Sequence, residues 1–482
     1  MNINQRRMNR YAGKVNRIND FARLLAISVD NAGVRDEERD DFLKWSVKLM
    51  YDNFKVERMN RRIEIEEEVR RCGIRFPNGT VGKEYEFRFT LPSEGISDVE
   101  LYRTEANGLE LIDAGQGEFI LKGKPEAAGD FSLTLCFKTV AGEPVSMIKY
   151  PIAFNPDPRS LWKEIDTDKN IPYYKEDCAK QYIKVGKDEN GLTRKDIVAA
   201  SRRGRSHAQE GKARDDHFRI WHSDSSGWYV MAVADGAGSA KYSRKGSEVA
   251  CDTVVEHCSK LLEDNQKFEE AIREFQADRE NKEKRTEVTR HVIEIIYKGA
   301  MKAHEALKRV SAANGETKLK DFATTLMFAI CKRYDFGWFV ASFWVGDGAI
   351  CLYDEESGTA RLLGTPDEGE YSGQTRFLTM PEIFRDPEVV AKRMRLTVVP
   401  DFTALMLMTD GVSDPMFETE NNLNDFEKWK EFYSTLRTGF SEDSIPGVDL
   451  TDDNEDSAVQ LLRWLDFWSP GNHDDRTIAI LY

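Results

Sequence analysis

Four apolar runs in the C-terminal part of this 482-residue chain, from residue 228 onward, each have an aspartate beside one end. The runs and their acidic neighbours are 228–234 with Asp235-Gly236, 338–345 with Gly346-Asp347-Gly348, 404–409 with Asp410-Gly411, and 477–482 with Asp474-Asp475. A single Asp-Gly pair usually marks a turn, because glycine allows positive φ and aspartate bonds its own backbone. Four such strand-like runs indicate more than four separate turns. Strands collected in one sheet system can bring their ends together, so the aspartates could form one cluster.

The chemistry that such a cluster would support is metal binding. Clustered carboxylates repel one another unless hard cations, which prefer oxygen ligands, lie among them. The glycine after Asp235 would let a backbone carbonyl approach a metal closely. An all-oxygen set suits Mg²⁺ or Mn²⁺, whereas softer metals would need His or Cys ligands. Two such cations about 3.5 to 4 Å apart can polarise a shared water and neutralise the oxygens of a phosphate ester.

The same residues form an ordered set of motifs that resembles a known family. In order and spacing, RDDHF, VADGAGSA, VGDG, MTDGVSD and HDDRT resemble the signature motifs of the metal-dependent protein phosphatases of the 2C type, and the DGAGSA form resembles a bacterial branch of that family. The resemblance covers about residues 199–482. It implies a catalytic α-β-β-α sandwich of two antiparallel sheets flanked by helices. The implied activity is serine/threonine phosphoprotein phosphatase, which hydrolyses phosphate monoesters through water activated by two Mn²⁺ or Mg²⁺ ions.

The resemblance also implies a role for each acidic residue. Asp235 matches the ligand that bridges both metals, Gly236 the residue that offers its carbonyl, and Asp410 and Asp474 the remaining carboxylate ligands; Asp235, Asp410 and Asp474 form the catalytic set. Asp216 matches the acid that holds metal-bound water from behind the ligands. Asp347 and Asp414 match the carboxylates that bind a third, weaker metal in many members. Asp475 stands where the family usually has asparagine and is not assigned as a ligand.

Two departures from the family pattern leave an alternative open. Ala237 replaces the histidine that often follows the Asp-Gly pair, and Gly211 stands where the family usually has a phosphate-gripping arginine. Arg205, His207 or Arg214 could supply a phosphate-binding charge, or these residues could form a solvated basic loop. The missing groups favour a pseudophosphatase or phosphoprotein-binding signalling module. The retained carboxylates favour the enzyme, because a site freed from catalysis has no need for mutually repelling acids.

The N-terminal region, residues 1–71, has a helical pattern from Asn16 to about Arg71. Phe42, Trp45 and Leu49 recur at the three-to-four spacing of a buried stripe. The charged run 64–71 reads as the solvated end of this helix. Both a bundle-like interaction module and a simple packing helix are compatible with the segment.

Residues 72–157 are predicted to form a small all-β sandwich. Aromatic and aliphatic residues alternate with polar ones in runs such as YEFRF, and turn signals separate the runs. The stretch GEFILKGKPEAAGDFSLTL resembles the immunoglobulin-like repeats of bacterial proteins, which bind or space other modules. The polar residues 158–195 are interpreted as a linker, and residues 196–482 as the phosphatase domain. The predicted fold class is therefore α+β.

Composition limits the partners. The formal net charge is −15 and basic residues form no long block, so neither nucleic acid nor a membrane surface is an expected partner. No run of eighteen apolar residues or signal peptide is evident, which favours a cytoplasmic location. The seven scattered cysteines suggest neither a disulfide framework nor a zinc site. The expected partner is a protein phosphorylated on serine or threonine, either a cognate kinase or its target.

Overall fold

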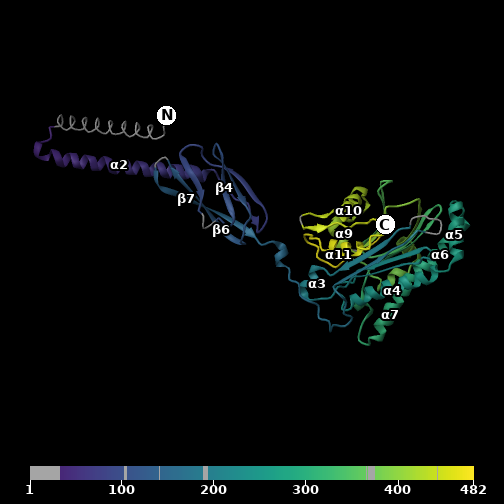
Figure 1. Cartoon of the computed structure of the whole chain (residues 1–482). Coiled ribbons are helices and arrows are strands. Elements are labelled where there is room, and N and C mark those ends of the chain that lie inside the picture. Colours follow the sequence, from purple (N-terminus) through teal and green to yellow (C-terminus); the bar gives the residue numbers. More distant parts are fainter. Residues whose placement is uncertain are drawn as a thin grey trace. The chain divides into compact units, whose positions relative to one another are not determined.

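The computed structural model describes residues 33–102, 106–139, 142–187, 194–364, 366, 375–441 and 443–482. The chain divides into two compact units, with the division between Leu161 and Trp162 (Figure 1). The smaller unit holds a β domain, and the larger one combines two sheets with helices. This arrangement confirms the predicted α+β class. Within the described ranges, no helix is both long and apolar enough to cross a membrane.

The first unit consists of one long helix and two small sheets. Its elements are α2 (Asp36–Arg71), β1 (Gly79–Thr80), β2 (Tyr85–Thr90), β3 (Ile96–Leu101), β4 (Leu109–Gly115), β5 (Glu118–Gly123), β6 (Gly129–Thr139), β7 (Gly142–Asn155) and the 3-10 helix η2 (Pro158–Leu161). The sheets have strand orders β1-β7-β6-β3 and β2-β5-β4. They share one apolar core, which includes Phe89 and Leu121 from one sheet and Leu133 and Ile148 from the other. The immunoglobulin-like resemblance of this domain stays a prediction.

Helix α2 differs from the sequence-based prediction at both ends. Phe42, Trp45 and Leu49, expected to form a buried stripe, are 38, 59 and 44% exposed. In the charged run expected to be solvated, Ile65 and Val69 are buried and join the β-domain core. The periodicity correctly indicated a helix, but spacing alone does not say which turns have a packing partner. The predicted helical residues 1–32 lie outside the described ranges.

The second unit contains the following elements: β8 (Cys178–Ile183), β9 (Ile197–Arg202), α3 (Arg205–Glu210), β10 (His217–His222), β11 (Trp228–Ala234), α4 (Ser243–Leu262), α5 (Gln266–Ala277), α6 (Lys282–Val292), a π-helical turn (Ile293–Tyr297), α7 (Lys298–Ala313), η4 (Leu319–Phe322), β12 (Leu326–Tyr334), β13 (Gly337–Val345), β14 (Ala349–Asp354), β15 (Thr359–Leu362), η5 (Pro381–Phe384), α8 (Pro387–Arg393), β16 (Met394–Val399), β17 (Ala404–Met408), α9 (Asp410–Phe417), η6 (Glu420–Asn424), α10 (Phe426–Thr438), β18 (Gly439–Phe440), β19 (Ile445–Pro446), α11 (Ser457–Trp464) and β20 (Arg476–Leu481).

These elements form four layers. One sheet has the order β10-β11-β12-β13-β16 and the other β15-β14-β17-β20-β9-β8. Successive side chains of β11 point to opposite faces: Met231 and Val233 pack between the sheets, whereas Val230 and Ala232 face the core beneath α4 and α7. Helices α10 and α11 cover the second sheet, as the packing of Trp429 and Leu461 shows (Figure 1). Both faces of both sheets are thereby buried.

The segment predicted as a linker, residues 158–195, is only partly a connection. The second unit begins at Trp162, and β8 within the predicted linker pairs antiparallel with β9, from Cys178 opposite Arg202 to Ile183 opposite Ile197. Strand β8 lies at the edge of its sheet and buries none of its six residues fully. A one-sided edge strand of this kind carries little apolar alternation, which is why composition suggested a linker.

Candidate metal centre and its supporting residues

Three of the aspartates predicted as metal ligands meet in space although they come from three separate strand ends. Asp235 follows β11, Asp347 follows β13, and Asp410 follows β17 and opens α9. Carboxylate oxygens of these three residues all lie within 4.8 Å of one another. We call Asp235, Asp347 and Asp410 the acidic cluster. The sandwich therefore brings together carboxylates from both of its sheets.

The main chain at Asp235 is fixed by two threonines that precede β12. The Asp235 amide donates to the Thr325 hydroxyl at 2.8 Å, and the Asp235 carbonyl accepts from the Thr325 amide and the Thr324 hydroxyl, both at 2.8 Å. The next residue, Gly236, has no room for a side chain, because a Cβ there would lie 2.7 Å from the Asp215 carbonyl oxygen. The Asp235-Gly236 turn is thus held by hydrogen bonds to Thr324 and Thr325 and by close packing against the main chain of Asp215.

Asp216 is fully buried just before β10 and reaches the acidic cluster. Its Oδ2 accepts hydrogen bonds from the hydroxyls of Thr409 and Thr477, at 2.9 and 2.6 Å, while its Oδ1 has no donor. Its carboxyl lies close enough to that of Asp235 to share a proton with it. Burial, followed by the charge of Asp475, raises the pKa of Asp216 to about 7.

The other acids of the site are also held in an unfavourable electrostatic environment. Burial raises the pKa of Asp235 and of Asp410 well above the usual range, and nearby carboxylates raise both further. Asp414 lies one helical turn after Asp410 in α9, and burial followed by the charge of Asp347 raises its pKa to about 6. Burial also raises the pKa of Asp474.

This donor set fits a hard divalent cation. The acidic residues offer only oxygen atoms, and two of those atoms, Oδ1 of Asp216 and Oδ1 of Asp347, are buried without a hydrogen-bond donor. Buried carboxylates that lack donors and raise one another's pKa are stabilised when a cation binds among them. All seven residues that the sequence assigned to metal binding lie in this region of the structure. They either contact one another or influence one another electrostatically: Asp216, Asp235, Gly236, Asp347, Asp410, Asp414 and Asp474.

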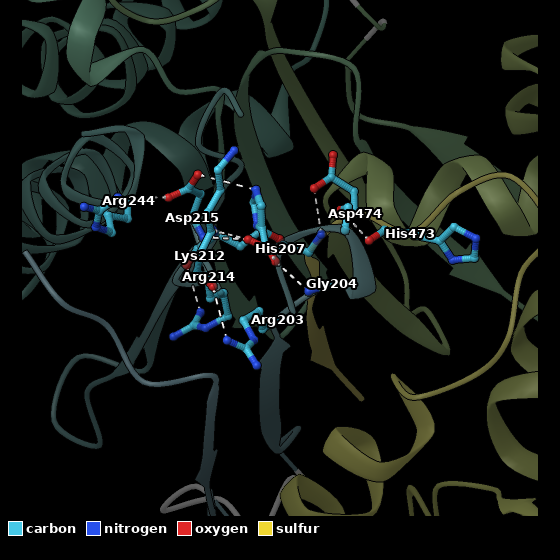
Figure 2. Close-up of polar contacts among 12 residues, drawn as sticks. Arg203, Gly204, His207, Lys212, Arg214, Asp215, Arg244, His473 and Asp474 are labelled. Atoms are coloured by element: carbon cyan, nitrogen blue, oxygen red, sulfur yellow. Dashed lines mark hydrogen bonds and ion pairs between the residues drawn. The ribbon is translucent and has the colours of Figure 1, made fainter. Parts of the chain in front are cut away.

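Asp475 belongs to a second arrangement, which sequence reasoning missed. Its Oδ1 accepts from the Gly204 amide at 2.6 Å and lies 3.0 Å from Nδ1 of His207, while its Oδ2 accepts from the Asp215 amide at 2.5 Å. Nε2 of His207 is 3.7 Å from Oδ2 of Asp215. Figure 2 shows His207 between Asp215 on one side and the segment with Gly204 and Asp474 on the other. We call Gly204, His207, Asp215 and Asp475 the His207 brace.

Within the His207 brace, the pKa of Asp475 is shifted in the opposite direction to those of Asp235 and Asp410 in the acidic cluster. Burial lowers the pKa of His207, but Asp475 and Asp215 outweigh it and raise this pKa to about 9. Burial likewise opposes ionisation of Asp475, but His207 and the amides of Gly204 and Asp215 hold its pKa below the usual range. His207 and Asp475 therefore form an ion pair within the brace, whereas burial and the charge of Asp475 raise the pKa of Asp215.

The structure does not bring the two candidate arginines to the acidic cluster. The Arg205 guanidinium donates to the carbonyls of Asp466 and Phe467, at 2.8 and 3.1 Å, and pairs with the Asp466 carboxylate. The buried Arg214 donates to the Asp216 carbonyl at 2.8 Å and to the Ser201 hydroxyl. Of the three candidate phosphate-binding residues, only His207 faces carboxylates of the site.

Sequence reasoning also missed the hydroxyl groups that hold the acids. Thr409 directly precedes Asp410 in MTDG, and Thr477 closes HDDRT, so both lie within motifs that had been singled out. A hydroxyl at the end of an otherwise apolar strand, next to an acid, was the available signal. Lys175, which donates to the Asp216 carbonyl at 3.0 Å, lies in the segment interpreted as a linker and gave no signal.

With the fold and site in place, comparison with known proteins identifies the family. The family model described as protein phosphatase 2C matches residues 203–447, which is just over half of the chain. The chain therefore belongs to the protein phosphatase 2C family. No curated protein matches it.

Solved structures give a weaker likeness. A bacterial serine phosphatase is 13% identical, with a TM-score of 0.32, and the match covers 59% of this chain and 96% of that one. A serine/threonine phosphatase from Staphylococcus aureus is 13% identical, with a TM-score of 0.32 and coverage of 62% and 97%. RsbX in complex with magnesium is 14% identical, with a TM-score of 0.32 and coverage of 63% and 100%. Scores at this level carry no argument about function.

Proposed function

We propose that this chain is a metal-dependent serine/threonine phosphoprotein phosphatase that hydrolyses phosphate monoesters with water. Family membership supports the general class. The observation that carries the proposal is the acidic cluster, in which carboxylates from three strand ends lie within 4.8 Å of one another and Oδ1 of Asp347 is buried without a donor. A stable fold gains nothing from such repulsion, so the acids are best explained by cations that they bind in the working protein.

The proposed cofactors are two Mn²⁺ or Mg²⁺ ions, with a third, weaker site. Asp235 would serve both principal ions, and the Gly236 carbonyl, Asp410 and Asp474 would complete the ligand set. Asp216 would act through water, and Asp347 with Asp414 would hold the third ion. When bound, the cations would polarise a water molecule and neutralise the charge of the phosphate.

The chain's own residues orient these ligands. Thr324 and Thr325 fix the main chain of Asp235, and Thr409 and Thr477 fix one oxygen of Asp216. We assign His207 to bracing rather than to phosphate binding, because two carboxylates already surround its ring. The substrate would be a protein phosphorylated on serine or threonine, such as a cognate kinase or its target, and the N-terminal unit would serve as a scaffold.

A chelator experiment tests this function. The full chain is assayed on p-nitrophenyl phosphate and on a phosphothreonine peptide, with Mn²⁺, with Mg²⁺ and with EDTA. We expect turnover with one or both metals and none in EDTA, with activity restored when metal is added back. Full turnover in the presence of EDTA would show that hydrolysis does not require a metal ion bound to these aspartates.

A pseudophosphatase that binds phosphoproteins is the second candidate, and one observation favours it. Both arginines that could have gripped a phosphate are engaged elsewhere, Arg205 with Asp466 and Arg214 with the Asp216 carbonyl. A chain of this kind would bind the phosphothreonine peptide in the presence of Mn²⁺ without hydrolysing it. Calorimetric titration of the peptide beside the turnover assay separates the two candidates.

A further inference from the structure

The segment that precedes β8 lies across the back of the acidic residues. Residues 162–177, which we call the strap, begin at Trp162, whose ring lies 4.2 Å from that of His473, next to Asp474. Farther along, the Ile165 amide donates to the Ala208 carbonyl of α3 at 2.9 Å. Beyond this the strap continues toward α4, where Arg244 donates to the Pro172 and Tyr173 carbonyls of the strap.

Near its end the strap carries a lysine, Lys175, whose side chain reaches the interior. Nζ of Lys175 donates to the carbonyl oxygen of Asp216 at 3.0 Å and to the hydroxyl of Ser247 in α4 at 3.2 Å. That hydroxyl also donates to the Asp215 carbonyl. Lys175 and Ser247 together therefore hold the carbonyls of two successive aspartates, and Arg214 shares one of them.

These contacts matter for the carboxylate of Asp216 because hydrogen bonds fix only part of its side chain. Thr409 and Thr477 hold only Oδ2, while Oδ1 lies buried without a donor. The remaining control comes from the main chain, whose carbonyl oxygen at Asp216 accepts hydrogen bonds from both Lys175 and Arg214. A shift of this carbonyl would move Asp216 relative to Asp235. Residues that orient metal ligands from behind typically change metal affinity or activity by about 10- to 100-fold when removed.

We propose that Lys175 is a positioning residue of the metal centre, and that its hydrogen bonds to the Asp216 carbonyl and to Ser247 set the affinity of the site for its divalent cation. The inference rests on the proposed function in that it assumes cations at the acidic cluster. On this proposal the strap contributes to metal binding by the larger unit, although the composition of the strap is typical of a linker.

The test compares Lys175→Met in the full chain with Lys169→Met, which makes the same chemical change at an exposed position of the strap. Mn²⁺ affinity is measured by calorimetric titration, together with kcat and KM on p-nitrophenyl phosphate and the melting temperature in EDTA. We expect Lys175→Met to weaken Mn²⁺ binding about 10- to 100-fold, with KM for the ester nearly unchanged. Lys169→Met should leave all of these values as in the wild type.

A double variant distinguishes positioning from general packing. If Lys175 acts partly through Ser247, the losses of Mn²⁺ affinity in Lys175→Met and Ser247→Ala should be less than additive when combined. Wild-type Mn²⁺ affinity in a Lys175→Met chain whose melting temperature has fallen would overturn the proposal and leave a purely structural lysine. If Lys175→Met does not fold, Ser247→Ala alone decides, and unchanged Mn²⁺ affinity in it would overturn the proposal.

These readouts keep the two hypotheses apart. A wild-type chain that binds Mn²⁺ without hydrolysing an ester contradicts the proposed phosphatase activity, while its Mn²⁺ affinities still decide the role of Lys175. A wild-type chain that binds neither Mn²⁺ nor Mg²⁺ contradicts both.

Discussion

Asp474 and Asp475 are adjacent in sequence, yet the pKa values of their carboxyl groups are shifted in opposite directions. Burial and the charge of Asp475 raise the pKa of Asp474. Ligand atoms of His207, Asp474 and Asp475 lie within 4.8 Å of one another, and the charge of Asp474 also raises the pKa of Asp410 in the acidic cluster. Asp475 lies in the His207 brace, where a histidine and two backbone amides hold its pKa below the usual range. Both side chains come from the one loop between α11 and β20.

This difference suggests how a carboxylate that binds metal can be distinguished from one that only supports the fold. Asp475 has its hydrogen-bonding capacity satisfied by protein groups, namely Gly204, His207 and Asp215. In contrast, Asp216 and Asp347 each retain a buried oxygen without a donor. A buried carboxylate oxygen without a donor indicates a cation where several carboxylates meet, as they do at the acidic cluster; by itself it does not, because Oδ1 of Asp215 in the brace also lacks a donor.

The largest expected effect is the loss of charge at the centre of the acidic cluster. Asp235→Asn should lower kcat by about a thousandfold, because this residue is proposed to serve both principal cations. Mn²⁺ affinity, measured by titration, should fall with it. Asp335→Asn is the matched control, since Asp335 lies in the turn between β12 and β13 and pairs only with Arg273 at the surface. Near-normal turnover of Asp235→Asn would refute the two-metal assignment.

The next effect compares the two neighbours directly. Asp475→Asn would place an amide group against the Gly204 or Asp215 amide, so a buried donor loses its acceptor. We expect the free energy of unfolding to fall by about 2 kcal/mol, measured by urea denaturation. Asp474→Asn should instead leave the metal-free fold as stable as the wild type or more stable and weaken Mn²⁺ binding. Equal stability of the two metal-free variants would contradict the claim that Asp475 supports the fold while Asp474 does not.

This expectation replaces one that the sequence supported. Because Asp475 stands where the family usually has asparagine, an asparagine there would have seemed the best tolerated change. Neighbouring aspartates look alike in sequence, and only the fold shows that Asp475 accepts from two amides that lie about 260 and 270 residues earlier in the chain. Such long-range pairing leaves no local pattern.

Other features could be predicted where the signal is local. The apolar runs that precede Asp235, Asp347 and Asp410 are strands, since long buried runs ending at Asp-Gly are strong strand and turn signals. Strand β8 and the strap could not be predicted, because an edge strand and an extended segment bury few side chains. The hydrogen-bond partners of Arg205 and Arg214 could not be predicted either, because the charge of a side chain does not identify the group that it binds.

A smaller effect should separate the two residues proposed for the third cation. Asp414→Asn should keep the principal metal site and lose rate by about tenfold only at low Mn²⁺ concentration, because Asp414 is exposed and lies outside the acidic cluster. Asp347 lies within the acidic cluster itself, so Asp347→Asn should also lose rate at saturating Mn²⁺. Measuring kcat across a Mn²⁺ titration distinguishes these outcomes. Identical curves for both variants would place the two carboxylates at a single cation.

The smallest effect is a pH dependence of the metal-free protein, which follows from the raised pKa of Asp235. An unfolded aspartate titrates near 3.9, and burial together with Asp410 holds the pKa of folded Asp235 well above that. Between these two values the folded chain keeps a proton that the unfolded chain releases. The group therefore destabilises the fold increasingly as pH rises, by at most about 1.4 kcal/mol per pH unit.

Asparagine carries no such cost, so the melting temperature of Asp235→Asn in EDTA should exceed that of the wild type by a margin that grows from pH 5 to pH 8. Asp335→Asn should show no change in its margin over the same range, because Asp335 is exposed. Saturating Mn²⁺ should reverse the order, since a bound cation stabilises only the chain that retains the carboxylate. A margin that is constant with pH would mean that Asp235 is ionised without cost in the metal-free protein, and the electrostatic contrast between cluster and brace would then fail.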